Sequence, residues 1–443
     1  MSLAAKCVIL RRFDKMKDNK KINGILSLSP LVAFLAIYVV SSLVAGDFYG
    51  VPVSAVFLLA CILAVAISKG SISDRMKTFA RGAGKPKVML MIWIFILAGA
   101  FAGTAKDIGS VEATVNAALH LLPPKMLLAG LFLTSCFISM AIGTSVGTIV
   151  ALMPLGAGIA AQTGVETALM AGVVVGGAFF GDNLSFISDT TIASTRAAGC
   201  EMKDKFRTNI WIVLPAVVVV AAIYIWLGRD VSLVAEAGDV NIVKVLPYLL
   251  IIVLALAGCD VLLLLSIGIA AIAVTGWCFG DFGWTGWLES VGGGIAGMSD
   301  LIIVTLLAGG LLEVIRENGG LDVVISLLTR RVHGRKGAQA SIAALVCLAN
   351  VCTANNTIAI ITVGDIARDI AERFGIAPRK TASLLDTFSC FTQGLIPYGA
   401  QLLMASGLCG ISPTAIIPFL FYPFVMGICA VGSILLDLPK VSD

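Results

Sequence analysis

Long apolar runs alternate with short polar segments along almost the whole chain. An α-helix needs roughly 20 apolar residues to cross a bilayer, and ten runs are predicted as crossings: 25–44, 51–68, 88–105, 167–195, 208–228, 244–258, 261–279, 299–315, 381–405 and 413–436. Two further segments, 126–161 and 338–374, are apolar on both sides of a polar centre. Exposed polar backbone is costly in lipid, so we predict that each forms a re-entrant hairpin whose tip stops inside the membrane.

Composition supports a helical membrane protein. Of the 443 residues, 58% are hydrophobic and 13% are charged, whereas charged residues make up about a quarter of a typical soluble domain. The continuous apolar runs differ from the short alternating segments of an outer-membrane barrel. The 11 cysteines are scattered without Cys-x-x-Cys spacing, which favours helix packing over a metal or redox site.

Basic residues indicate the orientation, because short cytoplasmic loops are enriched in Lys and Arg. Residues 1–24 are basic and are predicted to form a cytoplasmic N-terminus, with 25–44 as an uncleaved first span rather than a signal peptide. The loops predicted to be cytoplasmic are 69–87, 196–207, 316–337 and 364–380, and the connection at 229–243 is predicted to lie outside. This pattern also puts the C-terminus in the cytoplasm, and we expect the inner membrane of a bacterium.

The chain is predicted to contain two related halves. Residues 25–228 form the first transmembrane repeat and residues 244–436 the second, each with five crossings and one hairpin. Because five is odd, the second copy enters the membrane upside down relative to the first. The predicted fold is an all-α polytopic membrane protein with inverted-topology repeats of five spans each, two re-entrant hairpins and two broken helices. Inverted repeats of this kind are typical of secondary transporters, which bind substrate near the midplane.

Polar side chains gather at the interruptions of the apolar runs. The first broken span contains the candidate ion ligands Asp182, Asn183, Ser185, Ser188, Asp189 and Thr190. The hairpin tips contain Thr144, Ser145, Thr148, Thr353, Asn355, Asn356 and Thr357, and the second broken span contains Asp386, Ser389 and Thr392. Intramembrane polar groups of this kind mark substrate and ion pathways.

Asp182 and Asp189 are the strongest candidates for sodium ligands. They are seven residues apart, so in an unbroken helix they would share a face. Hard cations such as sodium favour oxygen ligands, and burial favours the protonated form of a carboxylate. Such a group can hold either sodium or a proton. The alternative is that one aspartate only stabilises the N-terminus of a half-helix. For Asp386, a solvated position near the cytoplasm is the alternative.

The first broken span resembles a known family. Residues Gly181 to Thr191, preceded by Gly143 to Thr148, are similar to the signature of the NhaC-type sodium/proton antiporter family, within the ion-transporter superfamily. The stretch Leu395-Ile396-Pro397-Tyr398 resembles that family's Ile-Pro-Trp motif. The resemblance implies sodium/proton exchange, with ion binding around Asp182 and Asp189. Phe186 stands where the family usually has Pro, and the family's usual His near Phe206 is absent, which weakens an inference to pH regulation.

These observations predict a secondary active transporter that exchanges sodium for protons, and not an enzyme. The alternative is a sodium-coupled carrier or exchanger of a small organic acid or amino acid. No Lys or Arg is predicted near the breaks to bind a dicarboxylate, which argues against that substrate. We expect no cofactor, with sodium and protons as transported species and the lipid bilayer as the surroundings. An organic solute and a homodimer remain open, and no nucleic acid is expected.

Overall fold

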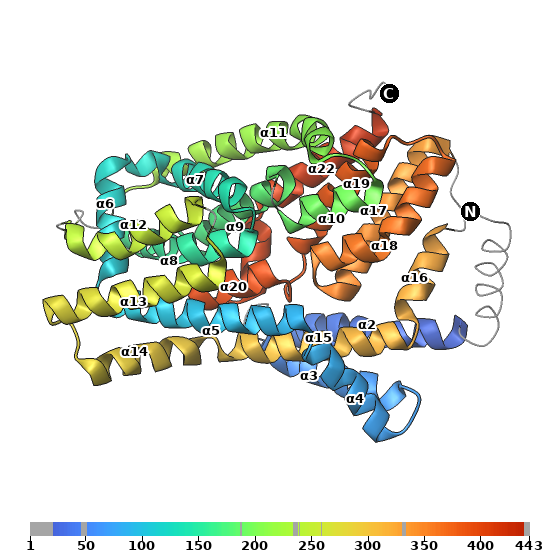
Figure 1. The fold of residues 1–443 in the computed structure, drawn as a ribbon, viewed down its shortest axis with the longest axis horizontal. Helices are drawn as coiled ribbons and strands as arrows, with labels where there is room; N and C mark the ends of the chain where they lie inside the picture. The colour runs from blue at the N-terminus through green and yellow to red at the C-terminus, as the bar shows by residue number, and fades with distance from the viewer. Residues whose placement is uncertain are drawn as a thin grey trace. The chain divides into compact units, whose positions relative to one another are not determined.

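All regular secondary structure that the computed structural model describes is helical. The described residues are 21–45, 51–186, 188–233, 238, 240–257, 259–329 and 334–437. Figure 1 shows the helices coloured in chain order, from blue at the N-terminus to red at the C-terminus. The first half contains α2 (Lys21–Ala45), α3 (Val53–Ile67), α4 (Ile72–Ala83), α5 (Pro86–Asp107), α6 (Ser110–Leu121), η1 (Pro124–Met126), α7 (Leu127–Ile142), α8 (Ser145–Thr163), α9 (Thr167–Leu184), α10 (Asp189–Ala198), α11 (Met202–Leu227) and η2 (Gly228–Asp230).

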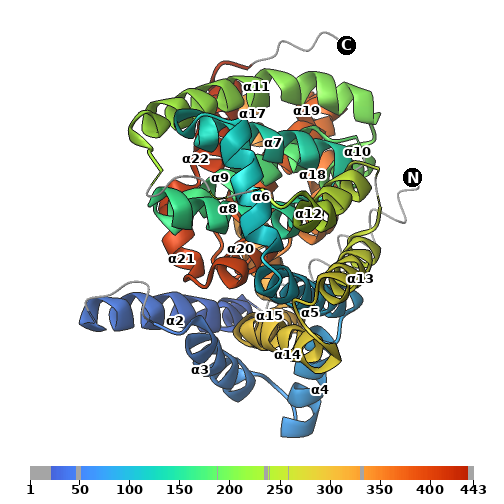
Figure 2. The ribbon, with the colours of Figure 1, turned by 90° about the vertical axis from the view of Figure 1, so that its left-hand side faces the viewer.

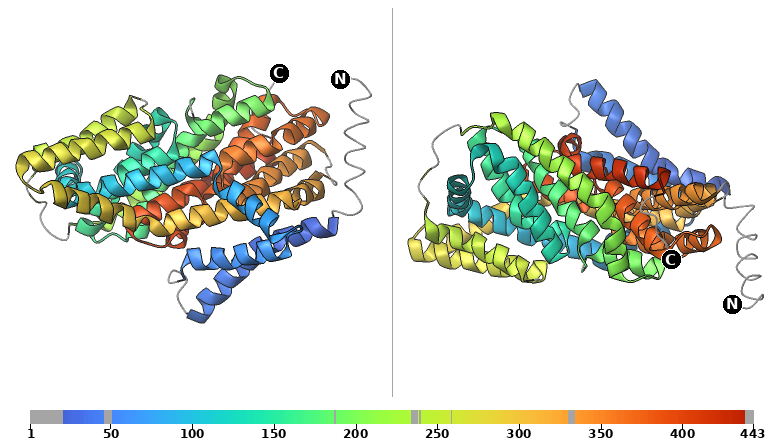
Figure 3. Two further views of the ribbon diagram at one scale, coloured as in Figure 1. Left: turned by 60° about the horizontal axis from the view of Figure 1, so that its bottom comes forward. Right: turned by 90° about the horizontal axis from the view of Figure 1, so that it is seen from above.

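The second half has a similar succession of helices. It contains α12 (Ile242–Leu256), α13 (Val261–Phe279), α14 (Trp284–Gly297), α15 (Ser299–Glu317), α16 (Gly320–Thr329), α17 (Gly334–Thr353), α18 (Asn356–Arg373), α19 (Pro378–Gln393), α20 (Ala400–Cys409), α21 (Pro413–Ile416), η3 (Ile417–Phe419) and α22 (Phe421–Leu435). Helices α12 and α13 lie side by side, and are drawn in yellow-green in Figure 3.

Several helices have the length and composition of membrane spans. In the described residues seven helices qualify, or nine if each of two bent pairs is counted as one span. Helices α3, α12 and α22 are also apolar but have 15 residues each. These short helices fall in the predicted crossings 51–68, 244–258 and 413–436. Three of the seven qualifying helices, Pro124–Ile142, Ser145–Thr163 and Gly334–Thr353, lie instead in the segments predicted as hairpins. The chain is a multi-pass membrane protein, and the regular secondary structure of its described residues is helical.

The chain divides into two compact units. Unit 1 comprises residues 1–89 and 303–332, and unit 2 comprises residues 90–302 and 333–443. Each predicted half of the sequence therefore contributes to both units. All the candidate site residues named above belong to unit 2.

Helix α9 lies at the centre of unit 2. It contacts α7, α8, α10, α11, α19, α20 and α22, and several of these neighbours surround it in Figures 1 and 2. Within the span from α9 through α10, 88% of an apolar 18-residue window is buried inside the protein, more than in the other candidate spans among the described residues. Polar side chains on α9 therefore face other helices rather than lipid.

Glycines allow α7 and α9 to approach closely. A Cβ atom added at Gly177 would lie 2.4 Å from the Cβ atom of Ser135 and 2.7 Å from the carbonyl oxygen of Phe132. One helical turn further along α9, a Cβ atom at Gly181 would lie 2.3 Å from the carbonyl carbon of Ser139. Real Cβ atoms do not come this close to other atoms, so any larger residue would push the two helices apart. Small residues at such contacts are typical of helix packing in membranes.

Each segment predicted as a hairpin contains one sharp helix break. After α7, Gly143 adopts a left-handed conformation with φ of 76°, and Thr144 then caps α8. After α17, Ala354 adopts φ of 50°, and Asn355 caps α18 with its side chain. The two breaks therefore share one geometry, a left-handed residue followed by a polar N-cap. The helix-breaking residues were recognisable in the sequence.

The two predicted broken spans are also interrupted. Helix α9 ends at Leu184 and α10 begins at Asp189, so Asp182 and Asp189 belong to different helices. Their seven-residue spacing therefore does not give them a common helix face. Helix α19 ends at Gln393 and α20 begins at Ala400. Pro397 lies in this second interruption, as expected for a residue that cannot donate a backbone hydrogen bond.

Replacing Gly177 by Ala is expected to lower the free energy of unfolding by about 1–3 kcal/mol, because the added Cβ atom overlaps α7. The measurement is thermal unfolding of the purified protein in detergent. Gly432→Ala in α22 is the matched control, since a Cβ atom there has no heavy atom within 4 Å. Equal unfolding temperatures for the two variants would contradict the close α7–α9 contact.

The left-handed residues at the two hairpin breaks predict opposite effects on stability. Gly143→Ala should lower the free energy of unfolding by about 1–2 kcal/mol, because a side chain is strained at positive φ. Ala354→Gly should not lower it, because the loss of strain at this position offsets the greater chain entropy of glycine. Both are measured by unfolding in detergent. A clear loss of stability in Ala354→Gly would contradict the left-handed geometry of the second break.

Candidate functional site

The Asp182 carboxylate is buried near the C-terminal end of α9. Its side chain accepts a hydrogen bond from the Ser145 hydroxyl at 2.6 Å and from the Ser145 backbone N–H at 3.1 Å. Ser145 is the first residue of α8, so its N–H belongs to a helix N-terminus, where backbone dipoles favour negative charge. Gln401 of α20 also donates to the Ser145 hydroxyl, at 2.9 Å. The first hairpin break and the second broken span thus meet at Ser145, which in turn bonds Asp182.

The polar residues of the first broken span satisfy the backbone at the break. The hydroxyls of Ser188 and Thr190 both donate to the carbonyl oxygen of Asp182, at 2.9 and 2.8 Å. Both side chains are buried. Because α9 ends at Leu184, this carbonyl has no partner within its own helix, and the two hydroxyls take the place of that partner. Ser185, also a predicted ligand, is buried in the same interruption.

Asp189 has a different environment from Asp182. It is exposed and forms the first residue of α10, directly after the N-cap Ser188. A carboxylate in the first turn of a helix is stabilised by the helix dipole. This position fits the alternative of a helix-terminus aspartate, and sodium binding by Asp189 remains a prediction. Asp182 alone of the two is enclosed by the protein.

Asp386 is fully buried, so the solvated position considered for it is wrong. Its Oδ2 atom lies 2.9 Å from the ammonium nitrogen of Lys205. The same atom accepts hydrogen bonds from the side-chain amides of Asn209 and Asn183, at 2.8 and 3.1 Å. Both Lys205 and Asp386 have side chains that are at most 1% exposed. This is a buried ion pair between α11 and α19.

The expectation that no Lys or Arg lies near the breaks is also wrong. Lys205 was assigned to a cytoplasmic loop at 196–207, but it is a buried residue of α11. Besides Asp386, its ammonium contacts the carbonyl oxygen of Asn183 at 2.8 Å and the hydroxyl of Thr191 at 2.7 Å. Its carboxylate partner belongs to the protein, so Lys205 is not free to bind a solute carboxylate.

Sequence reasoning missed three other residues of the site. Asn209 follows Lys205 by four residues on the same face of α11, and Tyr422 of α22 donates to the Asn183 side chain at 2.9 Å. Gln401 bonds both Ser145 and Gln393, the latter at 3.0 Å. The Lys205–Asn209 spacing was a signal available in the sequence, whereas the contacts of Tyr422 and Gln401 depend on the tertiary fold.

The remaining predicted residues mostly stabilise local backbone. The hydroxyls of Thr148, Ser389 and Thr392 donate to backbone carbonyls three or four residues earlier in their own helices. At the second hairpin break, Thr353 donates to the carbonyl oxygen of Asn355, and the Asn356 side chain accepts from the Thr357 N–H. Asn356 and Thr357 are buried. The structure does not bring this second tip into hydrogen-bond contact with Asp182 within the described residues.

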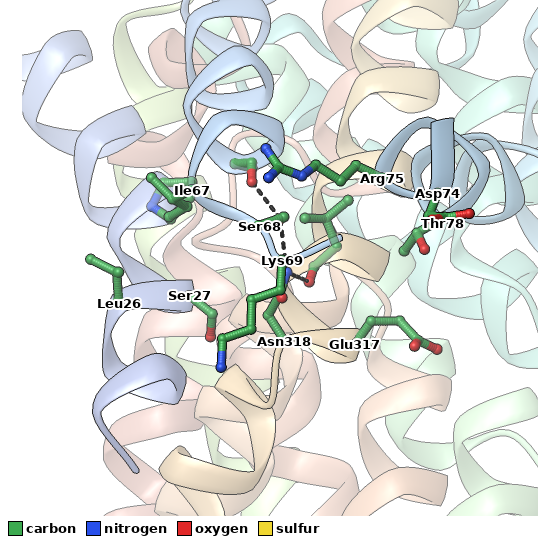
Figure 4. Close-up of a pocket in the computed structure, with 13 residues that line it drawn as sticks. Leu26, Ser27, Ile67, Ser68, Lys69, Asp74, Arg75, Thr78, Glu317 and Asn318 are labelled. Carbon is green, nitrogen blue, oxygen red and sulfur yellow. Dashed lines mark hydrogen bonds between the residues drawn. The ribbon is translucent and has the colours of Figure 1, made fainter. Parts of the chain in front are cut away.

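A separate cavity of about 320 Å³ lies in unit 1 (Figure 4). Its charged lining residues are Lys69, Asp74, Arg75 and Glu317, two of each sign. The Arg75 guanidinium donates to the carbonyl oxygens of Val65 and Gly70, at 2.9 and 3.0 Å. Arg75 therefore satisfies the backbone at the C-terminus of α3. Of the described residues around this cavity, none is a predicted ion ligand.

The chain is similar to several known antiporters. It is 24% identical to the Malate-2H(+)/Na(+)-lactate antiporter of Bacillus subtilis (strain 168), over 75% of this chain and 78% of the relative. It is 25% identical to the Na(+)/H(+) antiporter NhaC of Alkalihalophilus pseudofirmus, over 75% of this chain and 79% of the relative. The Na(+)/H(+) antiporter NhaC of Bacillus subtilis (strain 168) is 24% identical, over 77% of this chain and 82% of the relative.

The family model covers most of the sequence. The model of the Na+/H+ antiporter family matches residues 21–229 and 236–438, which include both breaks, both broken spans and the buried Lys205–Asp386 pair. The chain belongs to the Na+/H+ antiporter family.

Proposed function

We propose that the protein exchanges sodium for protons and that Asp182 is the group on which the two ions compete. The observation that carries this proposal is the charge of the groups that contact the Asp182 carboxylate. Within the described residues, the hydrogen bonds to the Asp182 carboxylate come from Ser145, which is neutral. Asp386, by contrast, is paired with the Lys205 ammonium. Two carboxylates and one ammonium leave one negative charge without a protein partner.

An uncompensated carboxylate inside a protein is unfavourable. It becomes stable when it takes up a proton or when a cation binds beside it, but the two ions neutralise the same charge. Sodium binding therefore displaces the proton, and a proton displaces sodium. If Asp182 is reached alternately from the two sides of the membrane, this competition is sufficient for antiport. Ser145 bonds the Asp182 carboxylate, and Ser188 and Thr190 bond the backbone carbonyl oxygen of the same residue. These hydroxyls are candidate oxygen ligands of the type that hard cations prefer.

We further propose that the two halves form inverted repeats. The order of helices supports this: two interrupted segments, α7–α8 and α9–α10, recur as α17–α18 and α19–α20. Both hairpin breaks combine a left-handed residue with a polar N-cap. The segment made of η1 and α7 has 19 residues, and α8 also has 19 residues. The first hairpin is therefore long enough to cross the membrane twice. Whether it crosses twice or turns back inside the membrane, the chain returns to the side from which it entered.

A sodium-coupled carrier of an organic acid is the second candidate function. The observation that favours it is the similarity to a malate/lactate antiporter, at an identity close to that of the NhaC relatives. Against it, the buried ammonium of Lys205, which contacts the first broken span, is already paired with Asp386. Transport measurements with and without malate and lactate separate the two functions.

Asp182→Asn is expected to abolish sodium-driven proton movement, because an amide can neither release a proton nor neutralise sodium. Purified protein is placed in proteoliposomes, an inward sodium gradient is imposed, and internal pH is followed with a dye. Wild-type protein should respond to sodium alone. A wild-type response that requires added malate or lactate would support the carrier instead.

Asp189→Asn is the matched comparison, since it removes the same charge at an exposed position. Retained exchange in Asp189→Asn would assign the exchange to Asp182, whereas its loss would make Asp189 an essential ligand as well. Both variants are checked for insertion and unfolding temperature. Full exchange by Asp182→Asn would refute the proposed mechanism.

The proposed topology has both termini in the cytoplasm of a bacterium. Alkaline phosphatase is active only outside the cytoplasm, because its folding needs disulfides. A fusion after Lys77, in the predicted cytoplasmic loop 69–87, should be inactive. A fusion after Asn241, in the predicted external connection 229–243, should be active. The reverse pattern would overturn the orientation, and equal activity of the two fusions would overturn the count of crossings between them.

A further inference from the structure

The Lys205 ammonium is held as a bound cation would be. Its three contacts are with a carboxylate, a backbone carbonyl and a hydroxyl, contributed by Asp386, Asn183 and Thr191 at 2.7–2.9 Å. An ammonium has three hydrogens to donate, so these three oxygens use them all. Oxygen groups of these same types bind hard metal cations. The side chain therefore places a positive charge in a position suited to a metal ion.

Two oxygen atoms beside this ammonium have no hydrogen-bond partner within the described residues. They are Oδ1 of Asp386 and Oδ1 of Asn209, and both are buried. A buried acceptor without a partner is unfavourable by about 1–3 kcal/mol. Both residues also contact each other through the Asn209 amide, which donates to the other Asp386 oxygen at 2.8 Å. The cluster therefore has more oxygen ligands than its single ammonium uses.

The cluster is adjacent to the proposed exchange site. Asp182 precedes Asn183 in the chain, and Asn183 contacts both members of the ion pair, through its amide to Asp386 and through its carbonyl oxygen to Lys205. The charges of Asp182, Asp386 and Lys205 therefore act on one another in a water-poor region, where electrostatic interactions are strong. The charge available for an exchanged cation depends on all three.

We propose that Lys205 is a tethered cation that limits the site to one monovalent ion. This inference rests on the proposed exchange at Asp182. With Lys205 present, the two carboxylates can accept one further positive charge. Without it, they carry two negative charges beside a set of carboxylate, amide, carbonyl and hydroxyl oxygens, which suits a divalent ion such as calcium. Lys205 is thus a specificity-determining residue.

The first test replaces Lys205 by Met, which has a similar length and no charge. Calcium binding to the purified protein in detergent is measured by isothermal titration calorimetry. Lys205→Met should bind calcium at least tenfold more tightly than wild type, and the double variant Lys205→Met/Asp386→Asn should return to the wild-type value. Lys203→Met is the matched control, because Lys203 is exposed and pairs with Glu201 at the surface. Unchanged calcium binding in Lys205→Met would overturn the proposal.

A second test does not depend on the single Lys205 variant. Asp386→Asn leaves the ammonium without its carboxylate, so sodium affinity should fall at least tenfold. The double variant should bind sodium within about threefold of wild type, because its charge balance is restored. A double variant that binds no better than Asp386→Asn would overturn the inference.

These binding measurements separate the two proposals. Failure of sodium-driven proton movement in wild-type proteoliposomes would refute the proposed function. Normal wild-type exchange with no effect of Lys205 on ion charge selectivity would refute only this inference.

Discussion

The structure is organised around a buried carboxylate that pairs with no cation within the described residues. Asp182 is held by the hydroxyl and N–H groups of Ser145 at the start of α8, while the second carboxylate, Asp386, is neutralised by Lys205. The difference between the two carboxylates gives them different roles. Asp386 forms an ion pair with Lys205, whereas the partner that we propose for the Asp182 carboxylate is a mobile ion. The surrounding breaks and hydroxyl groups make this enclosure compatible with a folded backbone.

Local sequence signals were sufficient to find the helix breaks. Gly143 with Thr144, and Asn355 after Ala354, are residues that end and restart helices, so the positions of both breaks could be read from the chain. The burial of Asp182 could be anticipated because it lies at a polar interruption in the middle of a predicted membrane span. These features depend on residues that are near one another in the sequence. They required no knowledge of which helices meet.

The environment of Lys205 could not be predicted in the same way. A lysine among charged residues before an apolar run is usually part of a loop, and its burial depends on contact with Asp386, which is 181 residues away in the chain. A shared face for Asp182 and Asp189 was expected only for an unbroken helix. The hydroxyls of Ser188 and Thr190 stabilise a break between the two residues, so this condition is not met.

The glycine contacts between α7 and α9 also limit how the protein can move. Gly177 and Gly181 lie against Ser135 and Ser139 with no space for a Cβ atom, and the Ser139 hydroxyl donates across the same interface to the carbonyl oxygen of Ala178 at 2.5 Å. Sliding or rotating one helix against the other would bring backbone atoms into collision. During a transport cycle, α7 and α9 should therefore move as a single rigid body. If Asp182 is the exchange group, as we propose, the gates that open it to either side should be formed by other helices.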